Sequence, residues 1–351
     1  MAHWGPRLHE EGDDMGRQAD GTWSEEWIPP TFTVDRNGKV VDYVNDRTPN
    51  NWGRWGELDE RGTVNLITDE KVREGAALIR TGQVISCAIP LDSKGPVHPT
   101  RTGVVHMYGY TGSDFVAGTI AGDHYRGFQG TDDYIFMPLQ GSTQWDGMAH
   151  FFYKDTMYNG FWIGNVESYA GARRGSIHNM KDSLTGRGVL LDIPRLKGLD
   201  RLEPGYAITP DDLEAAISAH GVTVGSGDIL VIRTGHVPYF YSLSDKSAFW
   251  DGRAPGIGRD CVQWLADRDV AALAMDNIAI EVEPFEEPFD HVYPLHSRLI
   301  RDLGLTLGEV WWLEDLADAC AADGRYEFFI CAPPLNVTNA SGAPLNPIVV
   351  K

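Results

Sequence analysis

The stretch QGSTQWDGMAH at residues 140–150 places four polar side chains within one short segment. Gln140, Gln144, Asp146 and His150 are separated by four, two and four positions. A carboxylate and an imidazole together serve to orient a catalytic base or to hold a cation. Glycines within the stretch allow a tight curl, which would turn these side chains toward one point. The pattern predicts an active-site loop; the alternative is an ordinary turn in which Asp146 caps its own backbone.

Nucleotide-binding and serine-hydrolase motifs are absent from the sequence. No GxGxxG opens a helix after a strand, and there is no GxxxxGK[ST], GxSxG or HExxH. These motifs carry phosphate cradles, the nucleophilic serine and one kind of zinc site. The sequence therefore predicts no nucleotide cofactor and no serine nucleophile.

Composition narrows the classes of partner. The chain of 351 residues is 42% hydrophobic and has 50 acidic against 30 basic residues, a formal net charge of −20. Such a surface repels phosphate backbones and anionic lipids, so neither nucleic acid nor a membrane is an expected partner. The N-terminus has no apolar core of a secretory signal, and no run of about 18 apolar residues exists. We expect a cytoplasmic protein with free cysteines, since no CxxC spacing occurs.

The elements that would position the loop follow from periodicity and from helix caps. Helices are expected over 68–82, 208–221, 259–269 and 296–304, and strands over 83–91, 134–139, 227–236, 270–277 and 326–335. Thr209, Pro210 and Gly221 mark both ends of the second helix. This order predicts an α/β class with a mixed β core. Residues 1–50 are expected to form an irregular N-terminal arm, and residues 51–351 a single catalytic domain.

The loop resembles the signature of the metal-dependent cyclase family, which includes bacterial kynurenine formamidases, isatin hydrolases and trans-dienelactone hydrolases. The family pattern H-x-G-T-H-x-D-x-P-x-H aligns with Q-G-S-T-Q-W-D-G-M-A-H here. Other similar stretches follow in family order at 55–68, 187–193, 226–236, 270–281, 295–317 and 332–348. The resemblance covers roughly residues 50–350 of the chain. It implies the swivelling β/β/α fold, with helices flanking the β core, assembled as a homodimer or homotetramer.

The resemblance also implies roles for the loop residues. Gln140, Gln144 and Asp146 stand where the family has three ligands of a divalent metal, commonly Zn²⁺ or Mn²⁺. His150 stands at the position of the catalytic acid/base.

A downstream histidine and glutamate complete the metal site in two-metal family members. The matching residues here are His296 and Glu314, with Glu309 as the other candidate. The spacing from His296 to Glu314 is longer than in the formamidases.

Two glutamines in place of histidines are the departure from the family pattern. An amide oxygen is a weaker and harder donor to Zn²⁺ than an imidazole nitrogen. Three outcomes follow: a hard ion such as Mn²⁺ or Mg²⁺ binds; the site works without metal, with Gln140 and Gln144 polarising a carbonyl; or the chain is an inactive relative that binds a small ligand.

The implied reaction is hydrolysis of an amide, lactone or ester bond in a small cyclic or aromatic substrate. His150 would activate water, with Asp146 holding the metal or orienting the imidazole. The same pair would also suit a lyase, a dehydratase or a ring-closing cyclase. Aromatic residues near the loop are candidate walls of the substrate pocket: Trp145, Phe151, Tyr153, Tyr158 and Trp55.

Overall fold

The structure is a computed structural model, and it describes residues 33–120, 127–286, 291 and 293–351. Residues 1–32 of the predicted N-terminal arm lie outside the described residues. Residues 33–50 contain no helix and only isolated bridges, such as that between Val34 and Val40. The domain boundary at residue 50 stays a prediction.

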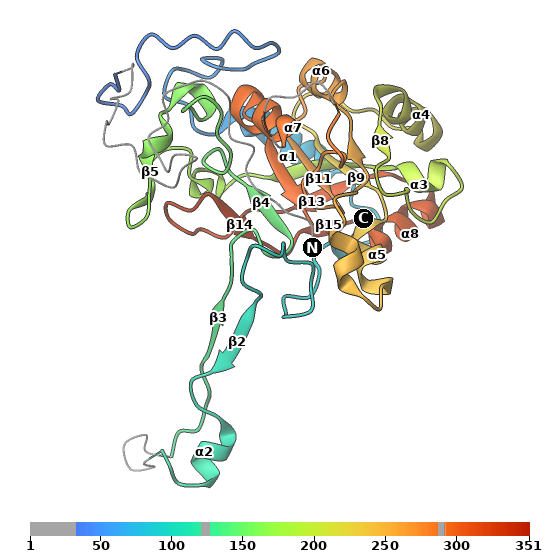
Figure 1. Ribbon diagram of the computed structural model, residues 1–351. Helices are drawn as coiled ribbons and strands as arrows, with labels where there is room; N and C mark the ends of the chain where they lie inside the picture. The colour runs from blue at the N-terminus through green and yellow to red at the C-terminus, as the bar shows by residue number, and fades with distance from the viewer. Residues whose placement is uncertain (1–32, 121–126, 287–290, 292) are drawn as a thin grey trace, which may run out of the picture.

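A nine-stranded mixed sheet forms the centre of the molecule, with helices around it (Figure 1). In spatial order its strands are β1 (Val84–Ser86), β15 (Ile348–Val350), β13 (Glu327–Cys331), β7 (Thr185–Asp192), β9 (Ile229–Arg233), β11 (Ala272–Met275), β12 (Thr306–Glu309), β4 (Gln144–Asp146) and β14 (Gly342–Pro344). The run β7–β9–β11–β12 is parallel, and the remaining pairs are antiparallel. The parallel strands are almost wholly buried, as their continuous apolar sequences require.

Within the described residues, eight α-helices connect or cover the strands. They are α1 (Asp69–Ala76), α2 (Gly112–Val116), α3 (Ile193–Leu196), α4 (Pro210–His220), α5 (His236–Ser242), α6 (Cys261–Asp267), α7 (Pro294–His296) and α8 (Glu314–Asp323). The Thr209 hydroxyl accepts from the amide of Asp212 to cap α4, and Gly221 ends it at φ 65°. A π-helical segment, Ser297–Leu303, continues α7. None of the helices in the described ranges has the length and apolar character that a membrane span needs.

The predicted α/β class, a mixed β core flanked by helices, is confirmed. Predicted elements are found with shorter bounds, as for the helix over 68–82, which ends at Ala76. Four short strands form two further small sheets, β5 (Val166–Glu167) with β6 (Gly171–Ala172), and β8 (Ala207–Ile208) with β10 (Gly256–Ile257). All four cysteines are free thiols.

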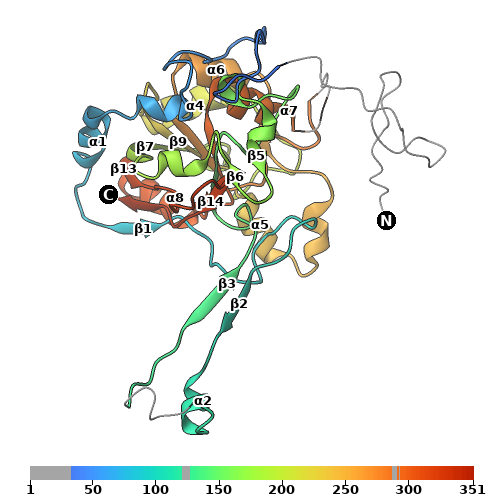
Figure 2. The ribbon, with the colours of Figure 1, turned by 90° about the vertical axis from the view of Figure 1, so that its left-hand side faces the viewer.

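The strand expected over 134–139 is found as β3 (Asp133–Phe136), outside the central sheet. It pairs with β2 (Val105–Tyr108) in a ribbon that projects from the body (Figures 1 and 2). One expectation about the signature loop needs correction. The second half of the predicted loop is itself a sheet strand, β4, because Gln144–Asp146 pairs with both β12 and β14.

Candidate metal centre and active site

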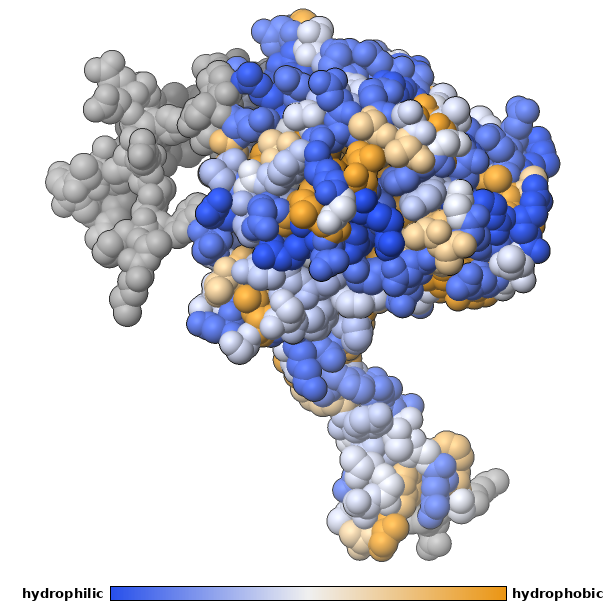
Figure 3. All heavy atoms as spheres, turned by 90° about the vertical axis from the view of Figure 1, so that its right-hand side faces the viewer, coloured by the Kyte–Doolittle hydropathy of each residue, from blue (hydrophilic) through white to orange (hydrophobic). Residues whose placement is uncertain are grey.

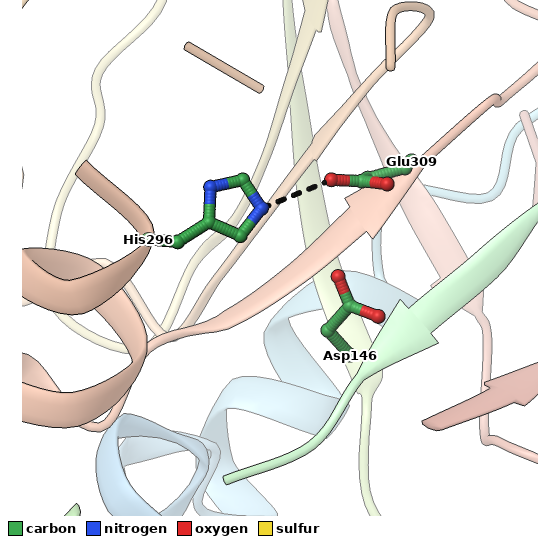
Figure 4. Close-up of side chains that lie close together, drawn as sticks. All are labelled: Asp146, His296 and Glu309. Atoms are coloured by element: carbon green, nitrogen blue, oxygen red, sulfur yellow. Dashed lines mark hydrogen bonds and ion pairs between the residues drawn. The ribbon is translucent and has the colours of Figure 1, made fainter. Parts of the chain in front are cut away.

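The pairing of β4 with β12 brings candidate metal ligands from these two strands together. Gln144 lies directly opposite Glu309, and Asp146 lies opposite Leu307. Residues two apart on a strand share a face, so Gln144, Asp146 and Glu309 lie on one face of the sheet. Figure 4 shows the Asp146 and Glu309 carboxylates directed toward each other from these two strands.

His296, at the end of α7, completes a cluster of three buried side chains. One ligand atom each from Asp146, His296 and Glu309 lies within 4.8 Å of the others. Nε2 of His296 is 3.2 Å from Oε1 of Glu309 (Figure 4). Burial alone would lower the pKa of His296, but hydrogen bonds and charges from Glu281 and Glu309 raise it to about 10.

Glu281 is the outer partner of His296, and sequence reasoning missed it. Its Oε1 lies 2.7 Å from Nδ1 of His296 and accepts from the His296 amide at 3.1 Å. Its Oε2 accepts from the amide of Leu295 at 3.0 Å. By accepting a hydrogen bond from Nδ1, this carboxylate directs Nε2 toward the cluster, the usual arrangement behind a metal-bound imidazole. Its signals in the sequence were its place a few residues after the buried strand β11 and its position at the end of the family-like stretch 270–281.

The pKa values of the two carboxylates in the cluster are shifted in opposite directions. Burial, together with the neighbouring Glu309, raises the pKa of Asp146 well above its ordinary value. Burial also acts to raise the pKa of Glu309, but the hydrogen bond and charge of His296 hold it below its ordinary value. Two carboxylates enclosed together strongly favour a cation between them.

The residues fit a divalent metal. Beyond the three converging ligand atoms, Oδ2 of Asp146 and Oε1 of Gln144 are buried and have no hydrogen-bond partner among the described residues. Nε2 of Gln144 donates to Oε2 of Glu309 at 3.0 Å, which holds the amide beside the carboxylates. Buried polar atoms are normally satisfied, and these two unpartnered oxygens suit the coordination of a cation.

His150 lies at the edge of this cluster, in the predicted position. Its Nε2 is 3.7 Å from Oδ1 of Asp146, and 22% of its side chain is exposed. Burial and the neighbouring His296 lower the pKa of His150 to about 4, so its ring is neutral near pH 7. A neutral imidazole that retains access to solvent is able to accept a proton from water.

The structure separates the predicted metal ligands into two groups. Asp146, Gln144 and His296 come together, and Gln140 does not join their hydrogen bonds, because its Nε2 donates to Oγ of Ser341 at 3.2 Å. Glu314 is also elsewhere.

Glu314 at the start of α8 is committed to Arg233. The guanidinium donates to both of its carboxylate oxygens, at 2.7 and 2.8 Å. The glutamate of the cluster is therefore Glu309, the alternative that the sequence left open, and this placement corrects the choice of Glu314.

The aromatic residues predicted to line the substrate pocket also fall into two groups, one near the cluster and one away from it. Phe151 lies beside the cluster, its ring centroid 5.3 Å from that of His296. Tyr153 lies two residues farther along the chain, and its ring centroid is 4.6 Å from that of His291.

Three other aromatic residues do not line the site. Trp145 is fully buried in the core, since it alternates with Gln144 and Asp146 and faces the other side of β4. Tyr158 is buried with its hydroxyl on Asp59, and Trp55 packs under Arg54.

A pocket of about 550 Å³ lies on the Glu281 side of His296, and none of Asp146, His150, His296 and Glu309 lines it. Glu281 and Leu295, which hold His296 in place, form part of its wall, and His291 and Arg47 form another part. This volume suits a small molecule.

Four residues with a left-handed backbone flank the ligand segments. Ala279 and Ile280 precede Glu281 at φ 75° and 57°, Tyr293 precedes α7 at φ 54°, and Val310 follows Glu309 at φ 58°. Left-handed conformations of such residues cost of the order of 1–3 kcal/mol each and persist at functional sites, where surrounding contacts enforce them.

Comparison with known proteins identifies the family of the chain. The cyclase family model matches residues 85–282 of the chain. The crystal structure of a novel cyclase has a TM-score of 0.81 and 47% sequence identity, over 86% of this chain and 99% of that one. None of the curated proteins compared with the chain matches it.

Isatin hydrolases are more distant. Isatin hydrolase A from Labrenzia aggregata, bound to benzyl benzoate, has a TM-score of 0.52 and 18% identity, over 78% of this chain and 94% of that one. Isatin hydrolase A from Ralstonia solanacearum has a TM-score of 0.55 and 17% identity, over 76% and 91%. At such identities the likeness shows a shared fold alone.

The resemblance found in the sequence is thus confirmed. The family model spans more than half of the chain, and the novel cyclase is nearly half identical over almost its whole length. The chain belongs to the cyclase family of enzymes.

Proposed function

We propose that this chain is a metal-dependent hydrolase that opens an amide or lactone bond in a small cyclic or aromatic substrate. The observation that carries the proposal is the convergence of Asp146, His296 and Glu309, with the neutral imidazole of His150 at their edge. A ligand cluster beside a separate base is the equipment that water-activating hydrolases need.

The ligands proposed for the metal are Asp146, Nε2 of His296, Glu309 and the amide oxygen of Gln144. Two carboxylates and an amide favour a harder ion than the imidazole-rich sites of zinc enzymes do, so Mn²⁺ is our first choice. A bound divalent cation would polarise the substrate carbonyl and make the attacking water more acidic.

His150 carries the proton. It accepts one from water as the water oxygen bonds to the carbonyl carbon, and returns it to the leaving nitrogen or oxygen as the C–N or C–O bond breaks. The product of ring opening is a carboxylate with an amine or hydroxyl group. Oδ1 of Asp146, 3.7 Å from Nε2, places a carboxylate near the ring as the ring becomes charged.

A flat substrate is supported by the surroundings of the cluster. Phe151 offers an aromatic ring beside His296, against which a flat compound can pack. The relatives of similar fold are named isatin hydrolases. Isatin is therefore a suitable first probe, together with the aryl lactone dihydrocoumarin.

The test is turnover of these probes by the Mn²⁺-loaded protein in ¹⁸O-labelled water, followed by mass spectrometry. Hydrolysis is expected to place one ¹⁸O in the product carboxylate. His150→Gln should lower the rate roughly 100-fold or more without loss of metal, whereas His106→Gln, on an exposed histidine, should not. Turnover with no label would contradict hydrolysis and favour lyase chemistry.

A further inference from the structure

Three guanidinium groups share one carboxylate beside the pocket of about 550 Å³. The buried carboxylate of Asp302 lies 3.2 Å from Nε of Arg47 and 3.5 Å from Nη1 of Arg298. Arg301, which is fully buried, pairs with the same carboxylate. Among the described residues, no second carboxylate lies within 4 Å of these three arginines. Positive charge is therefore in excess at this end of the pocket.

Such an excess is unusual in an acidic chain. The sequence has 50 acidic against 30 basic residues, and hydrophilic residues dominate the face of the body that Figure 3 shows. Burial lowers the pKa of Arg298, and the charges of Arg47 and Arg301 add to this effect. The carboxylate of Asp302 opposes them. Buried cations without a matching anion are costly, so a further anion at this place would be stabilising.

Arg47 has a hydrogen-bond donor left over. Its Nε lies beside Asp302, and its Nη2 donates to Oγ of Ser297 at 3.1 Å. Its Nη1 is buried and has no hydrogen-bond partner among the described residues. The guanidinium carbon lies 4.4 Å from the centroid of the Tyr153 ring, an aromatic contact that helps to hold the group in place. Buried polar atoms are normally satisfied, so this donor suits an oxygen atom of a ligand.

Arg47 and Arg298, the arginine pair, both line the pocket, and another part of its wall is apolar. Val262, Val282 and Leu295 contribute hydrocarbon side chains to that part. A site that combines cationic groups with an apolar wall fits a molecule that has an anionic group and a hydrocarbon body.

Three acidic residues also line the pocket, and each of them has a partner of its own. Oε1 of Glu281 pairs with the ring of His296. Oε2 of Glu286 accepts from the amide of Arg259 at 2.6 Å, and Oδ1 of Asp260 lies 3.7 Å from Nε of Arg259. These carboxylates are thus engaged with groups other than the arginine pair.

We propose that this pocket is a binding site for a small organic carboxylate, separate from the metal cluster. The anionic group lies on the arginine pair, where a carboxylate oxygen accepts from Nη1 of Arg47. Hydrogen bonds between a guanidinium and a carboxylate are of the stronger, charge-assisted kind. The hydrocarbon part packs against the apolar wall, which favours an organic acid over inorganic phosphate. A volume of about 550 Å³ gives room for a ring with a short side chain.

The test is titration calorimetry of the Mn²⁺-loaded protein with phenylacetate and with phenylacetamide, a neutral analogue of nearly the same shape. Phenylacetate should bind, and phenylacetamide should bind roughly tenfold or more weakly, because a charged hydrogen bond is lost. Arg47→Gln should weaken the binding of phenylacetate by a similar factor. Arg173→Gln removes the same charge from an exposed ion pair outside the pocket, and should leave the affinity unchanged.

Glu309→Gln distinguishes this pocket from the metal cluster, because Glu309 does not line the pocket. This variant should bind phenylacetate as the unaltered protein does, whereas loss of binding would place the acid on the metal and overturn the inference. Circular dichroism establishes that each variant is folded, and Arg298→Gln replaces an unfolded R47Q.

Three further results would overturn the inference. They are no binding of phenylacetate, equal affinity for its amide, and unchanged affinity in the folded variant of the arginine pair. Equal weakening in R173Q would do the same, since the effect would then not depend on the pocket. The result is independent of the proposed hydrolase activity, because binding is measured without turnover.

Discussion

Glu281 holds His296 by both its ring and its backbone: one carboxylate oxygen lies 2.7 Å from Nδ1 and 3.1 Å from the amide nitrogen. The orientation of the histidine is thus fixed before any ligand arrives. Such outer carboxylates raise the donor strength of a metal-bound imidazole. The segment that delivers Glu281 is strained at Ala279 and Ile280, so the fold stabilises an unfavourable backbone at this position.

Replacement of Glu281 by glutamine should weaken metal binding without removing a ligand. The amide is nearly isosteric but lacks the charge that stabilises the Nδ1 proton, so affinity for Mn²⁺ should fall about 10–100-fold. Isothermal titration of the metal-free protein measures this. Glu283→Gln, two residues on in the same segment and paired with Tyr293 rather than His296, is the matched control. Equal affinities for E281Q and the unaltered protein would show that the outer carboxylate is dispensable.

Gln144→His should change which metal the site prefers. Its amide oxygen is buried and unpartnered beside the cluster, so an imidazole there adds a stronger donor. Affinity for Zn²⁺ should rise roughly tenfold or more relative to Mn²⁺. Competitive titration with a chelating indicator gives the ratio. Gln140→His, at a position bonded to Ser341, should change it little. The opposite order of the two variants would contradict the placement of these glutamines.

Acid should destabilise the protein through His236. Burial and the nearby Arg201 lower the pKa of this ring to about 3, whereas an unfolded histidine titrates near 6.5. Below pH 6.5 the unfolded chain therefore takes up a proton that the folded chain does not. The stability contributed by neutral His236 is complete above pH 6.5 and is lost as the pH falls toward 3, at up to about 1.4 kcal/mol per pH unit.

His236→Phe removes that proton uptake and keeps a ring stacked on Phe249, 4.4 Å away. Denaturant unfolding at several pH values should show a shallower loss of the free energy of unfolding below pH 6.5 than in the unaltered protein. Identical slopes for H236F and the unaltered protein would remove His236 as a cause.

Short-range patterns in the sequence correctly predicted those features that depend on residues close together in the chain. The caps of α4 and the proximity of Asp146 to His150 depend on neighbours within a few residues, and both are found. The orientation of Trp145 was missed because residues 144–146 were expected to be a loop. Once they form a strand, alternation turns Trp145 to the core face.

The pairing of strands that lie far apart in the sequence determines which glutamate joins the cluster. Glu309 reaches the cluster because it lies opposite Gln144 across β4 and β12, 165 residues apart in the chain. Glu314 lies five residues farther, on a helix where Arg233 binds it. Spacing alone cannot distinguish these two glutamates, since each lies a plausible distance from His296 in the sequence.

The most direct measurement is the metal content of Mn²⁺-loaded, desalted protein by plasma mass spectrometry, in the unaltered chain and in Glu309→Gln and Glu314→Gln. Near one equivalent is expected in the unaltered protein and in folded E314Q, with a large loss in E309Q. No retained metal in the unaltered protein, or loss in E314Q with retention in E309Q, would contradict the metal centre of Asp146, His296 and Glu309.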